Sequence, residues 1–120
     1  MSGVNKAILV GRLGQDPELK YTNNGNAVCN FSIATSEKYK TKSGEQKEET
    51  QWHKCFAWGK TGELCAEYLS KGREVYVEGK IKTRSWETDQ GEKRYATEIE
   101  VGQVQFLGGK GSQGESNAPF

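Results

Sequence analysis

The sequence is poor in apolar residues and carries almost no net charge. Only 33% of its 120 residues are apolar, and 17 Lys and Arg are balanced by 16 Asp and Glu, which leaves a formal charge of +1. A chain of this length suits one domain with a single core. Because the charges nearly cancel, only their placement can indicate a nucleic-acid partner.

Membrane and secretion signals are missing as well. No apolar run approaches the roughly 18 residues of a membrane span, and the N-terminus lacks the apolar segment of a signal peptide. Cys29, Cys55 and Cys65 show no CxxC spacing, which favours buried thiols in a reducing compartment. We therefore expect a soluble, cytoplasmic protein.

Sets of residues typical of catalysis or metal binding are also missing. His53 is the only histidine, and Cys55 beside it has no second pair with which to complete a zinc site. Asp16 and Asp89 lie in predicted turns, without a nucleophile–base set nearby. We expect no enzymatic activity, no metal and no cofactor.

The first half of the chain has the pattern of β-strands. The 15 glycines and the low apolar content favour a small, turn-rich β fold. Val4–Val10 is a short apolar strand that Gly11 follows, and Ala27–Thr35 alternates apolar and polar residues as a half-buried strand does. The polar stretch Ser36–Thr50 predicts a long hairpin arm, after which Gln51–Trp58 resumes strand character.

One helix is predicted, over Thr61–Lys71. Its apolar stripe comprises Leu64, Cys65, Tyr68 and Leu69. Thr61 is placed to cap its start, and Gly72 stands where a glycine commonly ends a helix.

After the helix the period returns to two. Glu74–Trp86 predicts a strand in which Gly79 marks a bulge or bend. A turn near Asp89–Gly91 leads into a final strand, Tyr95–Leu107. Residues 109–120 predict a short, flexible, glycine-rich tail, disordered in structure.

The predicted order is five strands with a helix between the third and fourth. This is the order of the OB-fold, an all-β five-stranded barrel whose exposed sheet and loops bind oligonucleotides or oligosaccharides. We therefore expect one OB-fold domain over residues 1–108, followed by the tail over 109–120.

The aromatic residues of this barrel lie among cations. Trp52 and Trp58 share a strand face with Lys54, Trp86 shares one with Lys80, Lys82 and Arg84, and Tyr39 is flanked by Lys38, Lys40 and Lys42. Stacking of an unpaired base on an aromatic ring contributes about 1–3 kcal/mol, and the cations suit the phosphates. No Asn or Gln cluster indicates base reading, so we expect a sequence-tolerant binder of single strands.

Other interpretations of these residues remain open. A single Trp on a strand is more often a core residue, and alternating Lys and Arg usually form a solvated face. An adaptor OB-fold of the primosome type would act mainly through protein contacts and need not keep aromatic rings along a groove. A nuclease is the third hypothesis, and the sequence offers no residues for it.

Four stretches resemble the bacterial single-stranded DNA-binding protein family, and the likeness extends from Val4 to Gly109. They are VNKAILVGRLGQDPELKY from Val4, WHKCFAWGK from Trp52, EYLSKG from Glu67 and VYVEGKIKTRSW from Val75. The resemblance implies an OB-fold that assembles as a homotetramer, wraps single-stranded DNA, and acts in bacterial replication, recombination and repair, associated with the nucleoid.

The resemblance also assigns roles by position. The stacking aromatics fall on Tyr39, Trp52, Trp58 and Trp86, and the phosphate-contacting cations on Lys54, Lys60, Lys71, Lys82 and Arg84. Many members have Trp at the first aromatic position and Phe at the third, so this chain keeps a ring at both. The positions of Lys6, His53, Tyr76 and Glu78 map to subunit contacts.

The C-terminus departs from the family pattern. Members end in a long linker and an acidic tip closing in Pro-Phe, which recruits replication and repair proteins. Here the linker is short, and Glu115 is the one acid near Pro119 and Phe120. We expect this tip to dock in an apolar pocket with little help from charge.

Overall fold

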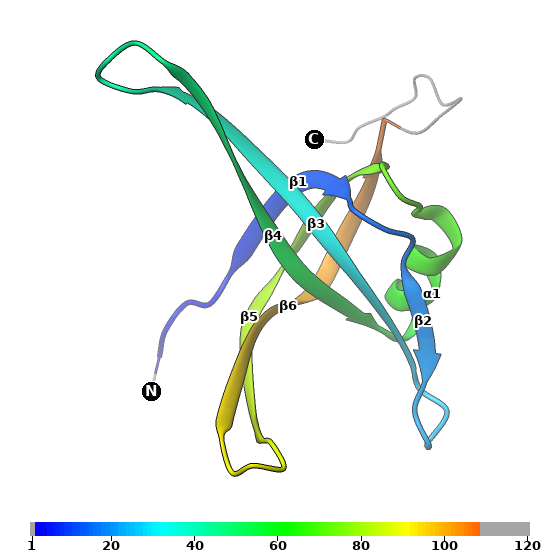
Figure 1. The fold of residues 1–120 in the computed structure, drawn as a ribbon. Helices are drawn as coiled ribbons and strands as arrows, with labels where there is room; N and C mark the ends of the chain where they lie inside the picture. The colour runs from blue at the N-terminus through cyan, green and yellow to red at the C-terminus, as the bar shows by residue number, and fades with distance from the viewer. Residues whose placement is uncertain (1, 109–120) are drawn as a thin grey trace.

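The computed structural model describes residues 2–108, which form six strands and one helix (Figure 1). In chain order they are β1 (Ala7–Leu13), β2 (Glu18–Tyr21), β3 (Ala27–Lys40), β4 (Gln46–Trp58), α1 (Gly59–Tyr68), β5 (Glu74–Glu87) and β6 (Lys93–Leu107). Five strands close a barrel in the order β1-β5-β6-β4-β3, because β3 also pairs with β1. The helix lies between the third and fourth of these strands, so the predicted OB-fold is confirmed.

The short strand β2 adds to the predicted set. It pairs antiparallel with β3 through four residue pairs, from Glu18–Asn30 to Tyr21–Ala27, outside the closed ring of strands. Within the ring β4 and β6 are parallel, whereas the other pairs are antiparallel.

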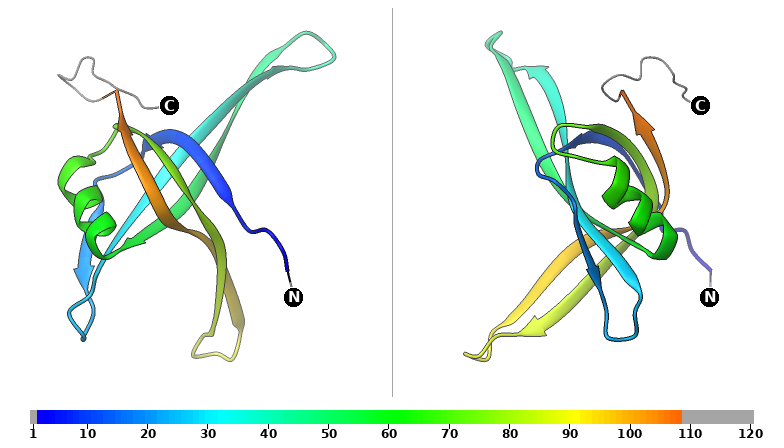
Figure 2. Two further views of the ribbon diagram at one scale, coloured as in Figure 1. Left: turned by 180° about the vertical axis from the view of Figure 1, so that it is seen from behind. Right: turned by 90° about the vertical axis from the view of Figure 1, so that its right-hand side faces the viewer.

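The core lies inside the barrel and follows the predicted alternation. Cys29 and Ile33 of β3 and Val75 and Val77 of β5 have no exposed surface. Burial of a Val or Ile side chain contributes about 1.5–3 kcal/mol relative to exposure. Leu69, which follows α1, is also buried, and the helix covers one end of the barrel (Figure 2).

A β-bulge interrupts the pairing of β5 with β6, as predicted at Gly79. Glu78 pairs with Gln103 whereas Gly79 pairs with Val101, so Gly102 is the extra residue of β6. A Cβ on Gly79 would overlap the carbonyl oxygen of Glu100, which explains the glycine. Because one residue is added to β6, its apolar side chains face the core both before and after the bulge.

The first strand and the helix differ from their predicted bounds. Gly11 lies inside β1, at the point where β1 turns from β5 toward β3, and a Cβ there would overlap the carbonyl oxygen of Ala34. The helix starts at Gly59 instead of Thr61, after an extended Trp58, and no side chain caps it. The predicted cap at Thr61 was therefore wrong.

The end of the helix also differs from the prediction. The helix ends at Tyr68, and Gly72, with φ of 85°, belongs to the turn that follows. The backbone N–H of Gly72 donates to the carbonyl of Leu13, so this turn fastens the segment to β1. Tyr68 was predicted in the buried stripe, but it is exposed and packs its ring against Phe106.

Two hairpin arms extend beyond the barrel (Figures 1 and 2). The predicted polar arm is formed by β3 and β4, which pair out to Lys40 and Gln46. The second arm is formed by β5 and β6, which pair out to Glu87 and Lys93. Both outer segments are exposed to solvent.

The predicted tail over 109–120, with Pro119 and Phe120, lies outside the described residues. Within residues 2–108, the single helix is too short and too polar to cross a membrane.

Candidate nucleic-acid interface

The candidate interface is the outer face of three neighbouring strands, β4, β6 and β5, which we call the binding face. Cα pairing joins Lys54 to Glu98, Lys82 to Glu98 and Trp86 to Arg94 across these strands. Side chains two residues apart on a strand share a face. The binding face therefore consists of Trp52, Lys54, Phe56, Trp58, Lys80, Lys82, Arg84, Trp86, Arg94, Ala96, Glu98 and Glu100.

The aromatic rings of this face are open to solvent. The exposed fractions are 60% for Trp52, 43% for Trp58 and 42% for Trp86. Large rings on half-buried strands usually belong to the core, but the core side of these strands is filled by Cys55, Ala57 and Val77. The three indoles are therefore available to a ligand.

Trp52 forms one wall of a groove with a volume of about 600 Å³. Lys54, Glu98, Asn30 and Ser32 are among its other lining residues. The ring lies directly against Gly14, where a Cβ would overlap ring carbons. The groove thus combines a stacking surface with a cation and polar side chains.

Trp86 lies beside two arginines. The guanidinium of Arg84 lies 4.8 Å from the ring centroid, a cation–π contact. Arg84 Nε and Nη2 also donate to the two carboxylate oxygens of Glu98, at 3.2 and 3.3 Å. The other arginine is Arg94, the register partner of Trp86.

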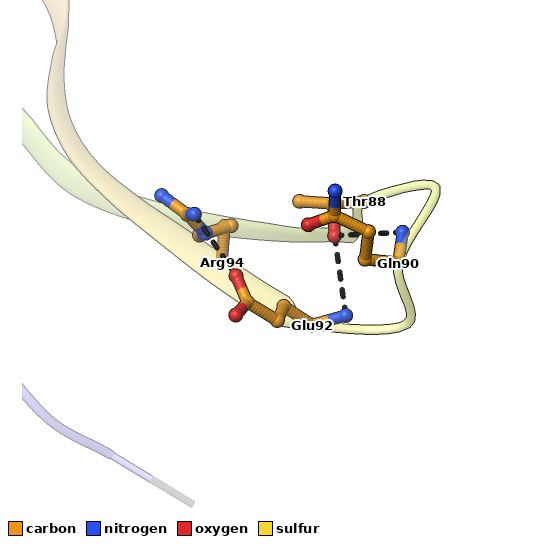
Figure 3. Close-up of polar contacts among 4 residues, drawn as sticks. All are labelled: Thr88, Gln90, Glu92 and Arg94. Carbon is orange, nitrogen blue, oxygen red and sulfur yellow. Dashed lines mark hydrogen bonds and ion pairs between the residues drawn. The ribbon is translucent and has the colours of Figure 1, made fainter.

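Arg94 was missed by the sequence analysis. Its guanidinium donates to the carboxylate of Glu92 at 3.0 Å, next to a turn in which Thr88 Oγ1 accepts the N–H groups of Gln90 and Glu92 (Figure 3). The predicted turn at Asp89–Gly91 could have revealed Arg94, because a hairpin centred on residue 90 pairs positions 86 and 94.

Trp58, the last residue of β4, lies at one end of the binding face. The ring of Trp58 meets Phe56 edge-on, with centroids 6.5 Å apart. Lys60 follows on the first turn of α1 and is exposed. Lys71 is exposed in the loop after the helix, where its backbone N–H donates to Asp16 Oδ1 at 2.9 Å.

Tyr39 lies apart from the other aromatics. It is 47% exposed on the β3–β4 arm and pairs with Lys47. The residues of β4 that share a face with Trp52 are even-numbered, so strand alternation places Tyr39 and Lys47 on the opposite side of the ribbon. The structure does not bring Tyr39 onto the binding face.

Three of the four predicted subunit-contact residues form a second cluster, on the outer face of β1 and β5. Lys6 Nζ lies 2.8 Å from Glu78 Oε2, and the Tyr76 hydroxyl donates to Glu78 Oε1 at 2.9 Å. These hydrogen bonds, from Lys6 first and then Tyr76, lower the pKa of Glu78. On the same face, Ile8 and Val10 of β1 are 57% and 46% exposed.

His53 is separate from this cluster. It lies on the inward row of β4, half-buried, where its Nε2 is 2.9 Å from Thr35 Oγ1. Within residues 2–108, no group of three or more His, Cys, Asp or Glu side chains is placed to hold a metal ion.

Comparisons with known proteins agree with one another. Residues 4–107 match the model of the single-strand binding protein family. "Single-stranded DNA-binding protein 1" of Chlorobaculum tepidum is 50% identical over 113 residues, which cover 93% of this chain and 70% of the relative.

Two solved structures are similar in fold and sequence. A Plasmodium falciparum SSB in complex with ssDNA has a TM-score of 0.84 and 36% identity, covering 90% of this chain and 98% of that one. A deletion mutant of the single-stranded DNA binding protein from Thermus aquaticus has a TM-score of 0.79 and 28% identity, covering 91% of this chain and 53% of that one.

Proposed function

The chain belongs to the single-strand binding protein family and is a single-stranded DNA-binding protein, and from this premise we propose that it holds unpaired strands on the binding face. The family binds DNA and is not enzymatic, which selects this function over the nuclease and the primosome-type adaptor. The observation that carries the proposal is the exposure of three indoles on one face, next to lysines and arginines.

The mechanism combines stacking with charge neutralisation. Bases stack on Trp52, Trp58 and Trp86, each stack contributing about 1–3 kcal/mol whatever the base. Phosphates are neutralised by Lys54, Lys82 and Arg84 of the binding face. Lys60, next to Trp58 in the chain, and Lys71, in the loop after α1, extend the path, and Tyr39 adds a stacking ring on the arm.

Binding with little regard to sequence follows from this chemistry. Every base has a π-face, whereas recognition of one base requires hydrogen bonds to its edge. Duplex DNA hides its π-faces in the stack, so the same surface discriminates against it. The solved ssDNA complex of the Plasmodium falciparum relative supports single-stranded DNA as the ligand.

Tryptophan fluorescence tests the proposal. Oligo-dT added to the protein at low salt should quench the emission strongly, and added salt should restore it. A hairpin duplex of equal charge should quench weakly. Unchanged emission with oligo-dT, together with no shift in a gel or anisotropy assay, would contradict the proposal.

Self-association is the second part of the proposal, in the form of a homotetramer. Ile8 and Val10 expose apolar surface beside Lys6, Tyr76 and Glu78. An exposed apolar strand face of this kind suits pairing with a second copy of the chain. The edge of β1 from Ala7 to Gly11 that faces away from β5 is not paired within the described chain. His53 is the fourth proposed contact.

The cellular role that we propose is protection of single strands in replication, recombination and repair, in the bacterial cytoplasm at the nucleoid. Residues 1–108 act as the DNA-binding domain. Pro119 and Phe120, which lie outside the described residues, would recruit replication and repair proteins through an apolar contact.

A further inference from the structure

Glu98 lies in the middle of the binding face, among the cations assigned to phosphate. It is the register partner of Lys54 on β4 and of Lys82 on β5. It also lines the groove that contains Trp52, and only 17% of its side chain is exposed. A carboxylate therefore occupies a surface that a polyanion has to enter.

The contact between Glu98 and Arg84 resembles the contact that arginine makes with phosphate. Two N–H groups of one guanidinium, Nε and Nη2, donate to two oxygens of one anion. Arginine binds carboxylate and phosphate in this same two-point geometry. The guanidinium is at the same time held over Trp86, so it is already positioned beside a stacking ring.

A neighbouring pair repeats the arrangement more loosely. Lys82 Nζ lies 3.5 Å from Glu100 Oε1. By contrast, Lys54, Lys60 and Lys71 form no ion pair within the part of the chain that the structure describes. Lys82 and Arg84 are thus neutralised internally, whereas Lys54, Lys60 and Lys71 are free to attract phosphate.

We propose that Glu98 is an intramolecular counterion, which occupies Arg84 in the free protein and competes with DNA phosphate for it. The inference rests on the proposed function. Two consequences follow: Glu98 lowers the affinity for single strands, and it reduces the salt dependence, because Arg84 contributes less than a full charge to the release of counterions from DNA.

Glu98→Gln tests the inference, since the amide keeps the shape of the side chain and removes its charge. At about 0.1 M salt the variant should bind oligo-dT roughly fivefold more tightly. This factor corresponds to the interaction of two unit charges about 4 Å apart in water. Its plot of log K against log salt should be steeper by up to about 0.7, so that the two proteins converge at high salt.

Glu45→Gln is the matched control. Glu45 is ion-paired with Lys47 at 4.0 Å at the end of the β3–β4 arm, away from the binding face. Glu45→Gln changes the net charge by the same amount as Glu98→Gln. It should leave affinity and salt slope near the wild-type values. Thermal melting of both variants establishes that they are folded.

The outcomes separate the inference from the proposed function. If wild-type protein fails to bind oligo-dT, the proposed function falls. If wild type binds but Glu98→Gln binds equally or more weakly with an unchanged slope, Glu98 is not a competing counterion. In an Arg84→Gln background the gain from Glu98→Gln should vanish; a gain that persists would overturn the role of Arg84.

Discussion

The indole of Trp52 lies directly against the backbone of Gly14, in the segment between β1 and β2. No side chain fits between them, because a Cβ at position 14 would overlap the far edge of the ring. Gly14→Ala should therefore turn the ring away from its position and weaken oligo-dT binding by about 1 kcal/mol, a fraction of one stacking contact. Fluorescence titration measures the loss.

Gly3→Ala is the control for this change, because nothing lies within 4 Å of a Cβ at Gly3. If Gly14→Ala lowers the melting temperature by many degrees but leaves affinity unaltered, the contact serves the fold and not the ligand.

Trp86→Ala and Trp52→Ala should each weaken oligo-dT binding by about 1–3 kcal/mol. Both rings are exposed, so thermal stability should change little. Tyr95→Ala is a suitable control, since Tyr95 is an exposed aromatic of the same β5–β6 arm but lies on its opposite side, paired with Ser85. Equal losses from Tyr95→Ala and Trp86→Ala would argue against a defined binding face.

The Asn5 side chain hydrogen-bonds both backbone groups of Ile81, as a neighbouring strand would. Its Nδ2 donates to the carbonyl of Ile81 at 3.0 Å, and the N–H of Ile81 donates to Oδ1 at 2.8 Å. Asn5→Ala should lower the free energy of unfolding by about 1–2 kcal/mol, because two hydrogen bonds are lost. Urea denaturation measures it, with Asn23→Ala in the β2–β3 turn as control; equal midpoints would refute the prediction.

Ile8→Glu should reduce the mass of the assembly measured by light scattering. The new carboxylate would lie beside Glu78, its register partner, on the face proposed for subunit contact. Tyr21→Glu places the same charge on an exposed apolar position of β2 and should leave the mass unchanged. A wild-type protein that scatters as a monomer would end the assembly proposal.

The three thiols should resist modification in the folded protein. Burial raises the pKa of Cys29 to about 11 and that of Cys55 and Cys65 to about 12. Ellman's reagent at pH 8 should detect none of them until denaturant is added. Rapid reaction in native buffer would contradict the burial of these side chains.

The same pKa values predict a loss of stability in alkali. The unfolded thiols release protons near their ordinary pKa of 9.0, whereas the folded thiols hold theirs to about 11–12. The folded state binds more protons in that window, so stability falls as the pH rises through it. Urea midpoints at pH 8 and pH 10 measure the effect, which Cys65→Ala should reduce.

Local patterns were sufficient to predict most of the fold. Strand alternation predicted the half-buried strand over Ala27–Thr35 and placed Trp52 and Lys54 on one strand face, and the glycine at 79 predicted the bulge. The ends of the helix were wrong because its start depends on the extended backbone at Trp58, where no side chain forms a cap. Propensity gives no signal for such a start.

Contacts between distant segments lay beyond local patterns. The contact of Trp52 with Gly14, and the position of Glu98 between Lys54 and Lys82, depend on how β1, β4, β5 and β6 meet in the closed barrel. The parallel pairing of β4 with β6 joins segments separated by α1 and β5. No period in the sequence encodes that register.

The single extra residue, Gly102, determines which side chains each face of β6 presents. Between Gly102 and the arm, Ile99 and Val101 turn inward and Glu98 and Glu100 turn outward; toward the C-terminus, Val104 and Phe106 take the inward positions. Deleting Gly102 would force one half of the strand to turn over. If the half that carries Glu98 and Glu100 turned over, these carboxylates would enter the apolar core and aliphatic side chains would face water, so the length of this strand is as strict a requirement as its composition.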